Sequence, residues 1–268
     1  MAAFKGLLFF LIGLYLLICA ALYTLQRNFL YIPPSVYYTP AGVNLSGAQE
    51  IRDPEQAEDI MGWWMPPKEA GAPVVMFFHG NGSAVFSSHE IYGALQKQGY
   101  GVFAAAYPGY PGRSGRPSQE SLTAAARSGY DFVTAQGINP NNIVFYGTSL
   151  GSGVAAQLSV DRAPALIIME APFTSVAEMA QRTFPIFPAA LLTKDKFDSR
   201  KALAGSGIPM IWMHGTQDRV IPLSVGQSLY DSYDGPKTSF IMQGGQHNNI
   251  WYLGGDDIIL EALAKLEN

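Results

Sequence analysis

The residues most able to do chemistry lie at 147–151, where GTSLG fits the pattern G-x-S-x-G. This stretch follows an apolar run at 143–146 and precedes a predicted helix over 150–160. A serine on such a strand-to-helix turn is exposed beside a helix N-terminus, whose backbone amides stabilise developing negative charge. The pattern therefore predicts Ser149 as a nucleophile. The same five residues are also compatible with a plain glycine-rich turn.

A serine nucleophile needs a general base, and the sequence contains four histidines that could supply it. His247 lies in the loop QGGQHNN after the last predicted strand, where two glycines let the chain turn back over the strand ends. His79 and His214 each follow a strand-like run in a His-Gly pair, so we expect them to be structural. His89 is predicted at the surface, early in a helix. His247 is the candidate base, although taken alone it fits a loop residue equally well.

The base in turn needs an acidic partner that fixes its tautomer. Asp218 lies in MHGTQDRVIP, just past a predicted strand, although it could equally cap the following helix. Three other aspartates lack that strand-end position: Asp198, Asp231 and Asp256. The chain order Ser149, Asp218, His247 is the order of one class of serine hydrolases, so three weak signals support one another.

An acyl-transfer site also needs donors for the oxyanion of its tetrahedral intermediate. The stretch FFHGNGSAV at 77–85 ends a predicted strand in a glycine-bearing loop before a helix. We expect the backbone amides of Asn81 and Leu150 to form the oxyanion hole. A tight turn without catalytic role has the same sequence, because these donors are backbone groups.

The elements that must position these residues alternate between strands and helices. Apolar runs predict seven strands, at 60–65, 73–78, 102–107, 143–146, 166–169, 210–213 and 239–242. Helical patterns lie between them, and one of these is expected to start at the cap Ser118 and to end near Gly137. Such alternation predicts an α/β fold, with a mostly parallel central sheet covered by helices on both faces. The proline-bearing segment 171–203 interrupts the rhythm and is expected to form a small cap.

With these residues in place, the chain resembles an α/β-hydrolase over roughly residues 45–268, and it is similar to the single-anchor membrane serine hydrolases of that superfamily. These include protein depalmitoylases, lysophospholipases and bacterial relatives. The resemblance rests on RNFLYIPP, FFHGNGSAV, YPGYPGRSGRPS, FYGTSLGSGVA, MEAPFTS, HGTQDRVIP and GGQHN. It implies a nucleophile at Ser149, an acid at Asp218, a base at His247 and oxyanion donors at Asn81 and Leu150.

The resemblance leaves the roles of several other residues open. Tyr107, Tyr110 and Arg113 lie in a stretch that borders the pocket in the family, and they either shape the pocket or are structural. Glu170 and Asp198 match family positions to which we assign no catalytic role. The sequence shows no large lid insertion of the triglyceride-lipase kind.

Composition excludes several other classes of protein. A formal net charge of −4 and a pI of about 5.5 give no basic footprint for nucleic acid. Cys19 is the only cysteine, so an intramolecular disulfide and a thiolate zinc site are both excluded. No phosphate-binding G-x-x-x-x-G-K loop occurs, and we expect neither cofactor nor metal.

The N-terminus carries a long uncharged stretch, LLFFLIGLYLLICAALYTL, at residues 7–25. As a helix it would be about 28 Å long, close to the thickness of a bilayer core. We expect residues 1–27 to be an uncleaved single-pass anchor, with a cleaved signal peptide as the alternative. Residues 28–44 would then form a juxtamembrane linker and 45–268 the catalytic domain. Lys5 together with the terminal amine slightly outweighs Arg27, which favours a cytoplasmic N-terminus and a catalytic domain on the other side.

These features favour a membrane-anchored serine hydrolase that cleaves acyl esters or thioesters, with lipids among the candidate substrates. A peptidase resembling the prolyl oligopeptidase group is the enzymatic alternative, but it needs an acidic anchor for a peptide amine, and 171–203 offers little beyond Glu178. A non-catalytic scaffold with the same fold is the third hypothesis. The presence of all three predicted catalytic residues argues against it.

Overall fold

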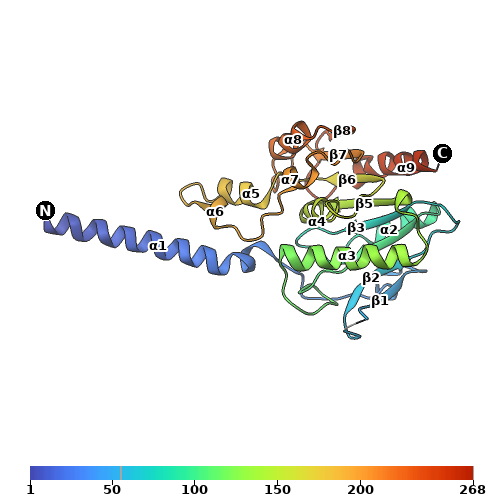
Figure 1. Cartoon of the computed structure of the whole chain (residues 1–268), viewed down its shortest axis with the longest axis horizontal. Coiled ribbons are helices and arrows are strands. Elements are labelled where there is room, and N and C mark those ends of the chain that lie inside the picture. Colours follow the sequence, from blue (N-terminus) through green and yellow to red (C-terminus); the bar gives the residue numbers. More distant parts are fainter. Residues whose placement is uncertain (55, 268) are drawn as a thin grey trace.

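An eight-stranded sheet forms the centre of the protein in the computed structural model, which describes residues 1–54 and 56–267 (Figure 1). Its strands are β1 (Gln49–Arg52), β2 (Ile60–Met65), β3 (Val74–Phe78), β4 (Gly101–Ala105), β5 (Ile143–Thr148), β6 (Leu166–Glu170), β7 (Met210–Gly215) and β8 (Lys237–Met242). They lie in the order β1-β2-β4-β3-β5-β6-β7-β8. The pairs β1–β2 and β2–β4 are antiparallel, and all other neighbours are parallel.

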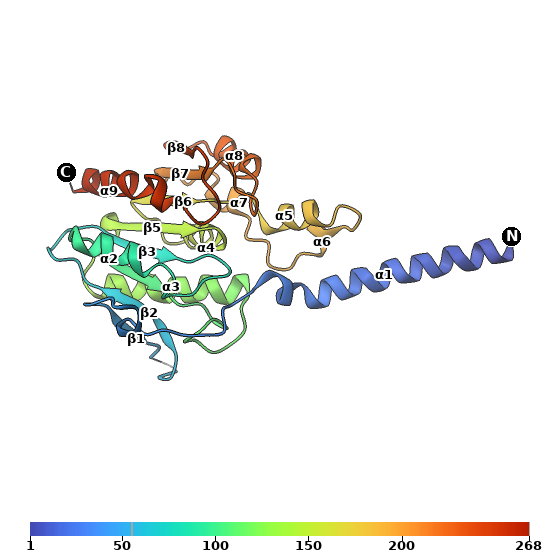
Figure 2. The same cartoon turned by 180° about the vertical axis from the view of Figure 1, so that it is seen from behind.

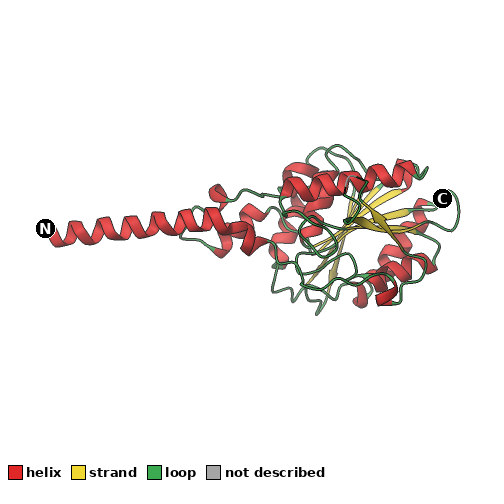
Figure 3. Cartoon of the chain, turned by 90° about the horizontal axis from the view of Figure 1, so that it is seen from below, coloured by secondary structure: helices red, strands yellow, loops and turns green. Residues whose placement is uncertain are grey.

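Helices cover both faces of this sheet (Figure 3). The main ones are α2 (His89–Lys97), α3 (Gln119–Ala135), α4 (Leu150–Leu158), α8 (Leu223–Ser232) and α9 (Gly255–Leu266). Apolar side chains of α3, α4 and α8 share one core with alternate residues of the strands, and those of α2 and α9 share a second core with the intervening residues. In β3, for example, Met76 belongs to the first core and Phe77 to the second. The central strands are apolar throughout because both of their faces are buried.

The structure confirms the expected fold class. All seven predicted strands form within a few residues of the expected limits, and Ser118 caps α3 through a reciprocal hydrogen-bond pair with Ser121. The edge strand β1 was not predicted. Its sequence, QEIR, has a single apolar residue, Ile51, and none of its four residues is fully buried, so it lacks the apolar run that would indicate a strand. Three short 3₁₀ helices complete the described structure: Ala41–Val43, Pro140–Asn142 and Trp251–Leu253.

A long helix, α1 (Ala2–Leu30), projects from the body of the protein (Figures 1 and 2). Residues 3–30 have a mean hydropathy of 2.4 over their best window and form a helix long and apolar enough to cross a membrane. Beside its C-terminal half lie α5 (Val176–Thr183) and α6 (Ala189–Leu192), and α7 (Ser199–Leu203) follows them closer to the sheet. These three short helices make up the segment 171–203, which we call the cap.

Candidate active site

Ser149 lies on a sharp turn between β5 and α4. Its backbone has φ 51° and ψ −118°, a left-handed conformation that is rare for a residue with a side chain. Its amide donates to the carbonyl of Glu170, which ties the turn to the end of β6. A Cβ atom at Gly151 would lie 1.9 Å from the carbonyl oxygen of Phe78, and one at Gly147 would lie 2.4 Å from that of Gly151. Both glycines are therefore required for the turn, as the motif predicts.

The three residues predicted to act together do lie together. His247 Nδ1 is 2.7 Å from Asp218 Oδ2, and His247 Nε2 is 2.9 Å from Ser149 Oγ. With its proton on Nδ1 donated to the carboxylate, the imidazole leaves Nε2 free to accept the serine hydroxyl proton. Asp218 follows β7 and His247 lies in the loop after β8, so the parallel strand ends bring together residues distant in the sequence.

The carboxylate of Asp218 is held rigidly behind the imidazole. Its side chain is fully buried, and its Oδ1 accepts hydrogen bonds from the amides of Val220 and Ile221 at 2.8 and 2.9 Å. Burial alone would raise the pKa of this carboxyl, but hydrogen bonds from the neighbouring histidines and from the Ile221 amide hold the pKa below its usual range. Asp218 is therefore ionised and fixed in orientation, as the acidic partner of a general base must be.

A cavity of about 380 Å³ opens in front of Ser149 and His247. Its lining mixes polar and apolar side chains from the loop after β3, from α2 and from the segment after His247. Beyond the two predicted catalytic residues, the following residues line it: Gly80, Asn81, Gly82, Ser83, Ser87, Ser88, Glu90, Ile91, Thr148, Glu170, Val220, Asn248, Trp251 and Tyr252. None of the residues lining this cavity belongs to the cap.

The two amides predicted to form an oxyanion hole flank this cavity. Among the described residues, the backbone N–H groups of Asn81 and Leu150 have no protein acceptor. The side chain of Asn81 is heavily engaged: Nδ2 donates to the carbonyl of Leu30 at 2.5 Å, and Oδ1 accepts from the amide of Ile32 at 3.0 Å and the hydroxyl of Tyr110 at 2.8 Å. The loop that carries one predicted donor is thus fastened to the end of α1.

His79 and His214 occupy structural positions, as expected, whereas His89, expected at the surface, is half-buried at the start of α2. His79 is buried against Tyr107, its Nδ1 lies 2.9 Å from the carbonyl of Gly80, and burial lowers the pKa of its imidazole to about 4. His214 is also buried, with Nε2 2.8 Å from the carbonyl of Ile221. His89 begins α2 and reaches the carbonyl of Phe86. His214 also lies 3.4 Å from Asp218 Oδ2, a contact for which the sequence gives no signal.

The structure assigns roles to the residues whose roles the resemblance left open. Arg113 pairs with Asp53 and donates to the carbonyl of Ala106, and Tyr107 is fully buried, so both are structural. Tyr110 contacts the site through Asn81. Asp198 caps α7 by accepting from the amide of Lys201.

Glu170, to which the sequence analysis assigns no catalytic role, lines the cavity as a buried acid. Its carboxylate accepts a hydrogen bond from the hydroxyl of Tyr146. Burial raises the pKa of this carboxyl to about 7, although the Tyr146 hydroxyl acts in the opposite direction. Its position at the end of β6 is the sequence signal that could have placed it in the cavity. No group of three or more metal-ligating side chains occurs among the described residues.

Comparison with known proteins agrees with this geometry. A family model described as the alpha/beta hydrolase family matches residues 75–231, more than half of the chain. An uncharacterized protein of Mycobacterium tuberculosis is 30% identical over 90% of this chain and 86% of its own length. The lysophosphatidylserine lipase ABHD12 of Danio rerio is 31% identical over 69% of this chain, which spans 55% of that longer relative.

Solved structures show the same fold at lower sequence identity. The Pyrococcus furiosus esterase Pf2001 superposes with a TM-score of 0.67 at 16% identity, covering 88% of this chain and 97% of that one. A monoacylglycerol lipase of Paleococcus ferrophilus superposes with a TM-score of 0.56 at 20% identity, covering 73% and 96%. The matched family, the parallel sheet and the relatives together show that this chain belongs to the α/β-hydrolase family.

Proposed function

We propose that the protein is a membrane-anchored serine hydrolase that cleaves carboxylic esters or thioesters through Ser149, His247 and Asp218. The observation that carries this proposal is the continuous hydrogen-bonded chain from Asp218 through His247 to Ser149, at 2.7 and 2.9 Å. Esterase and lipase relatives support the class of reaction.

In the proposed mechanism, Ser149 Oγ attacks the carbonyl carbon while His247 Nε2 takes the hydroxyl proton. The amides of Asn81 and Leu150 hold the oxyanion. The carbon–oxygen or carbon–sulfur bond then breaks, and the leaving alcohol or thiol takes its proton from His247. Water attacks the acyl-enzyme with His247 again as base, and this releases the carboxylic acid and the free serine. Asp218 stays ionised and stabilises the imidazolium at each step.

An ester substrate is better supported than a peptide. A peptidase of the prolyl oligopeptidase kind needs a free carboxylate to hold the peptide amine. Glu178 in the cap is already engaged, because it accepts from Thr174 at 2.6 Å and lies 3.5 and 3.7 Å from the guanidinium groups of Arg182 and Arg200.

We propose further that residues 1–27 anchor the protein in a membrane, that 28–44 link the anchor to the body, and that 45–268 form the catalytic domain. The support is the length and exposure of α1, whose apolar side chains between Leu7 and Leu17 face solvent.

Fluorophosphonate labelling of the full-length protein in detergent tests this function. We expect one adduct, on Ser149, and hydrolysis of short-chain p-nitrophenyl esters that the reagent abolishes. Ser83→Ala is the matched control, because Ser83 lines the same cavity but belongs to neither the hydrogen-bonded chain nor the proposed oxyanion hole. A folded protein that takes no label on Ser149 and cleaves neither esters nor thioesters would favour the scaffold hypothesis.

A further inference from the structure

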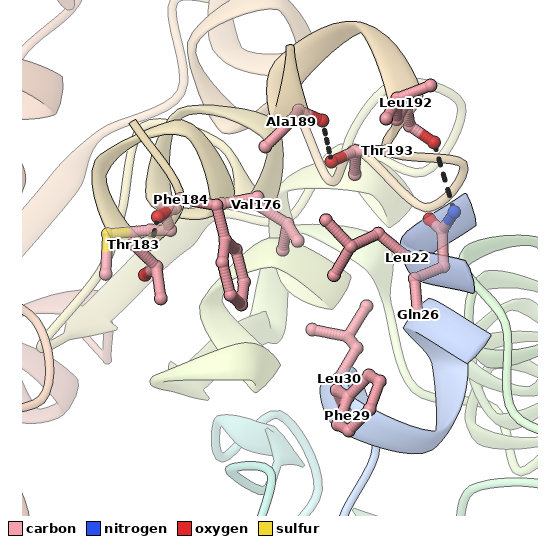
Figure 4. Close-up of a pocket in the computed structure, with 12 residues that line it drawn as sticks. Leu22, Gln26, Phe29, Leu30, Val176, Thr183, Phe184, Ala189, Leu192 and Thr193 are labelled. Atoms are coloured by element: carbon pink, nitrogen blue, oxygen red, sulfur yellow. Dashed lines mark hydrogen bonds between the residues drawn. The ribbon is translucent and has the colours of Figure 1, made fainter. Parts of the chain in front are cut away.

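A second cavity, of about 330 Å³, lies between α1 and the cap (Figure 4). It is lined by Leu22, Gln26, Phe29 and Leu30 of α1 and by Val176, Met179, Ala180, Thr183, Phe184, Ala189, Leu192 and Thr193 of the cap. None of these side chains is ionisable. The amide of Gln26 is occupied at the rim, since it donates to the carbonyl of Leu192 and accepts from the amide of Lys194. We call this cavity the groove, and its interior is aliphatic and aromatic.

Contacts along α1 fix how far the cap reaches beside it. Arg27 forms a bidentate ion pair with Asp195 at 2.7 and 2.9 Å, near the C-terminal end of the helix. Three turns earlier, the ring of Tyr15 stacks on Phe187 at 5.3 Å, and its hydroxyl donates to the carbonyl of Ile186. The cap thus accompanies the helix from Arg27 back to Tyr15.

The extent of these contacts along α1 decides where the cap lies if α1 spans a bilayer. The part of the helix beyond the cap, Ala2 to Leu14, is about 20 Å long at 1.5 Å per residue. A bilayer core is about 30 Å thick, so the free part alone is too short to cross it. The span must therefore include Tyr15 and the residues after it. The tip of the cap, which contacts Tyr15, then lies within one leaflet.

The surface chemistry of the cap agrees with that depth. At its tip, Ile186 and Leu191 are 78% and 79% exposed, an unfavourable arrangement in water and a favourable one among acyl chains. At its other end lie Lys194, whose ammonium stands 4.0 Å over the ring of Tyr23, and the Arg27–Asp195 pair. Charged groups therefore gather where the membrane surface is expected, and apolar groups where the hydrocarbon is expected.

The groove also adjoins the site described above. Leu30 lines the groove, and its carbonyl accepts the hydrogen bond from Asn81, which lines the cavity at Ser149. Both cavities lie at the end of the sheet where the parallel strands finish. An aliphatic chain in the groove would therefore lie beside the predicted oxyanion loop.

From these observations we infer that the groove binds one acyl chain of a bilayer lipid and holds that lipid beside Ser149. The occupant is a single aliphatic tail, because the groove is apolar, extends from Leu22, on the membrane side of Arg27, to Leu30 beside the site, and is large enough for part of one chain. The inference rests on the proposed function for its purpose, since it makes a membrane lipid the substrate of Ser149. Occupancy of the groove can nevertheless be measured without catalysis.

The probe is a lysophosphatidylcholine that carries a diazirine near the middle of its chain, in phosphatidylcholine vesicles that contain the full-length Ser149→Ala protein. This variant cannot form the proposed acyl-enzyme, so labelling does not depend on turnover. After irradiation and proteolysis, we expect adducts on groove residues of α1 and α5, such as Phe29 and Met179. Adducts confined to the outward face of α1, between Leu7 and Leu17, would overturn the inference.

A second measurement uses tryptophan substitutions that fill the groove with a large side chain. Ala180→Trp from the cap side and Leu22→Trp from the helix side should each lower groove labelling at least tenfold. In protein that retains Ser149, each substitution should also slow hydrolysis of a long-chain ester in vesicles. This loss of rate should be at least ten times greater than the loss on a soluble butyrate ester. Ile186→Trp is the matched control, because Ile186 is exposed on the same cap but does not line the groove.

The outcomes separate this inference from the proposed function. Groove adducts in a protein that cleaves no ester would support the lipid site and contradict the proposed hydrolase function. If both tryptophan variants cleaved esters normally and were labelled as strongly as before, the lipid site would be rejected and the hydrolase function would stand. Crosslinking of two copies through groove residues, in place of lipid adducts, would assign the groove to self-association and overturn the inference.

Discussion

The cavity at Ser149 and the groove differ in the elements that build them and in their polarity, although the hydrogen bond from Asn81 to Leu30 connects their linings. The cavity at Ser149 is built on strand ends. It is lined by Ser149, His247 and the buried acid Glu170, and the ionised Asp218 lies behind the imidazole. The groove is built from helices and lacks ionisable side chains. Precise polar geometry is supplied by the sheet, and apolar volume by short helices that lie beside α1.

The contrast teaches which changes should affect which property. A substitution among the strand-end residues alters the chemical step and should leave lipid binding intact. A substitution in the groove alters which substrate is presented and should leave chemistry on a soluble ester largely intact. Asn81 connects the two regions, because it lines one cavity and bonds to Leu30, which lines the other.

The largest effect is expected from Ser149→Ala and His247→Ala. Each removes a member of the hydrogen-bonded chain, and we expect turnover of a soluble ester to fall by roughly 10⁴-fold or more. Initial rates at saturating substrate check this, with circular dichroism to show that the fold persists. His89→Ala is the matched control, since His89 lies on α2 away from that chain. Turnover within tenfold of the unchanged protein in either variant would remove that residue from the mechanism.

A somewhat smaller loss is expected from Asp218→Asn. The amide keeps the shape of the side chain, but it favours the wrong imidazole tautomer, and we expect turnover to fall by roughly 10³- to 10⁴-fold with little change in KM. Steady-state kinetics with a soluble ester measure both parameters. Asp198→Asn, at the cap of α7, should leave turnover within about twofold. If the two variants behaved alike, Asp218 would be structural only.

The strand-end site could be predicted from the sequence, and the groove could not. Glycines at 147 and 151, the chain order of the three residues and the apolar strands are local signals, and the parallel sheet converts them into one place. The groove depends on the packing of α1 against 171–203, two segments far apart in the chain. Their contacts, such as Arg27–Asp195 and Tyr15–Phe187, leave no local pattern. For the same reason the hydrogen bonds of Asn81 with Leu30, Ile32 and Tyr110 were not predicted. The contact between His214 and Asp218 joins residues only four apart, but it depends on the path of the loop after β7, which the sequence does not indicate.

Asn81→Ala tests the connection between the two regions. The backbone amide at 81 is retained, but the side-chain bonds to Leu30, Ile32 and Tyr110 are lost, so the loop is held less firmly. Removing a whole oxyanion donor costs about 10²- to 10³-fold, and we expect misplacement of one to lower kcat by roughly tenfold with KM nearly unchanged. Asn248→Ala, in the same cavity, is the control. A rise in KM without loss of kcat would show that Asn81 only shapes the pocket.

The smallest effect on the reaction is expected from Glu170→Gln, whose main consequence is for stability. The pKa of this buried carboxyl rises from 4.5 to about 7 on folding. Between those values the folded state keeps a proton that the unfolded state has lost, so the contribution of Glu170 to stability falls as the pH rises. The full shift corresponds to about 3 kcal/mol. Glutamine still accepts from Tyr146 but cannot ionise, so the variant should gain stability relative to the unchanged protein by up to that amount between pH 5 and pH 8.

Urea unfolding of both proteins in detergent, at pH 5 and pH 8, measures that difference, and the exposed Glu120→Gln serves as the control. A difference that stayed constant over this range would mean that Glu170 does not titrate there in the folded protein. The expected result would instead sharpen the contrast between the two cavities. Acidity would then change the stability of the strand-end site through a buried carboxyl. Labelling of the groove, which contains no ionisable side chain, should stay the same across the same pH range.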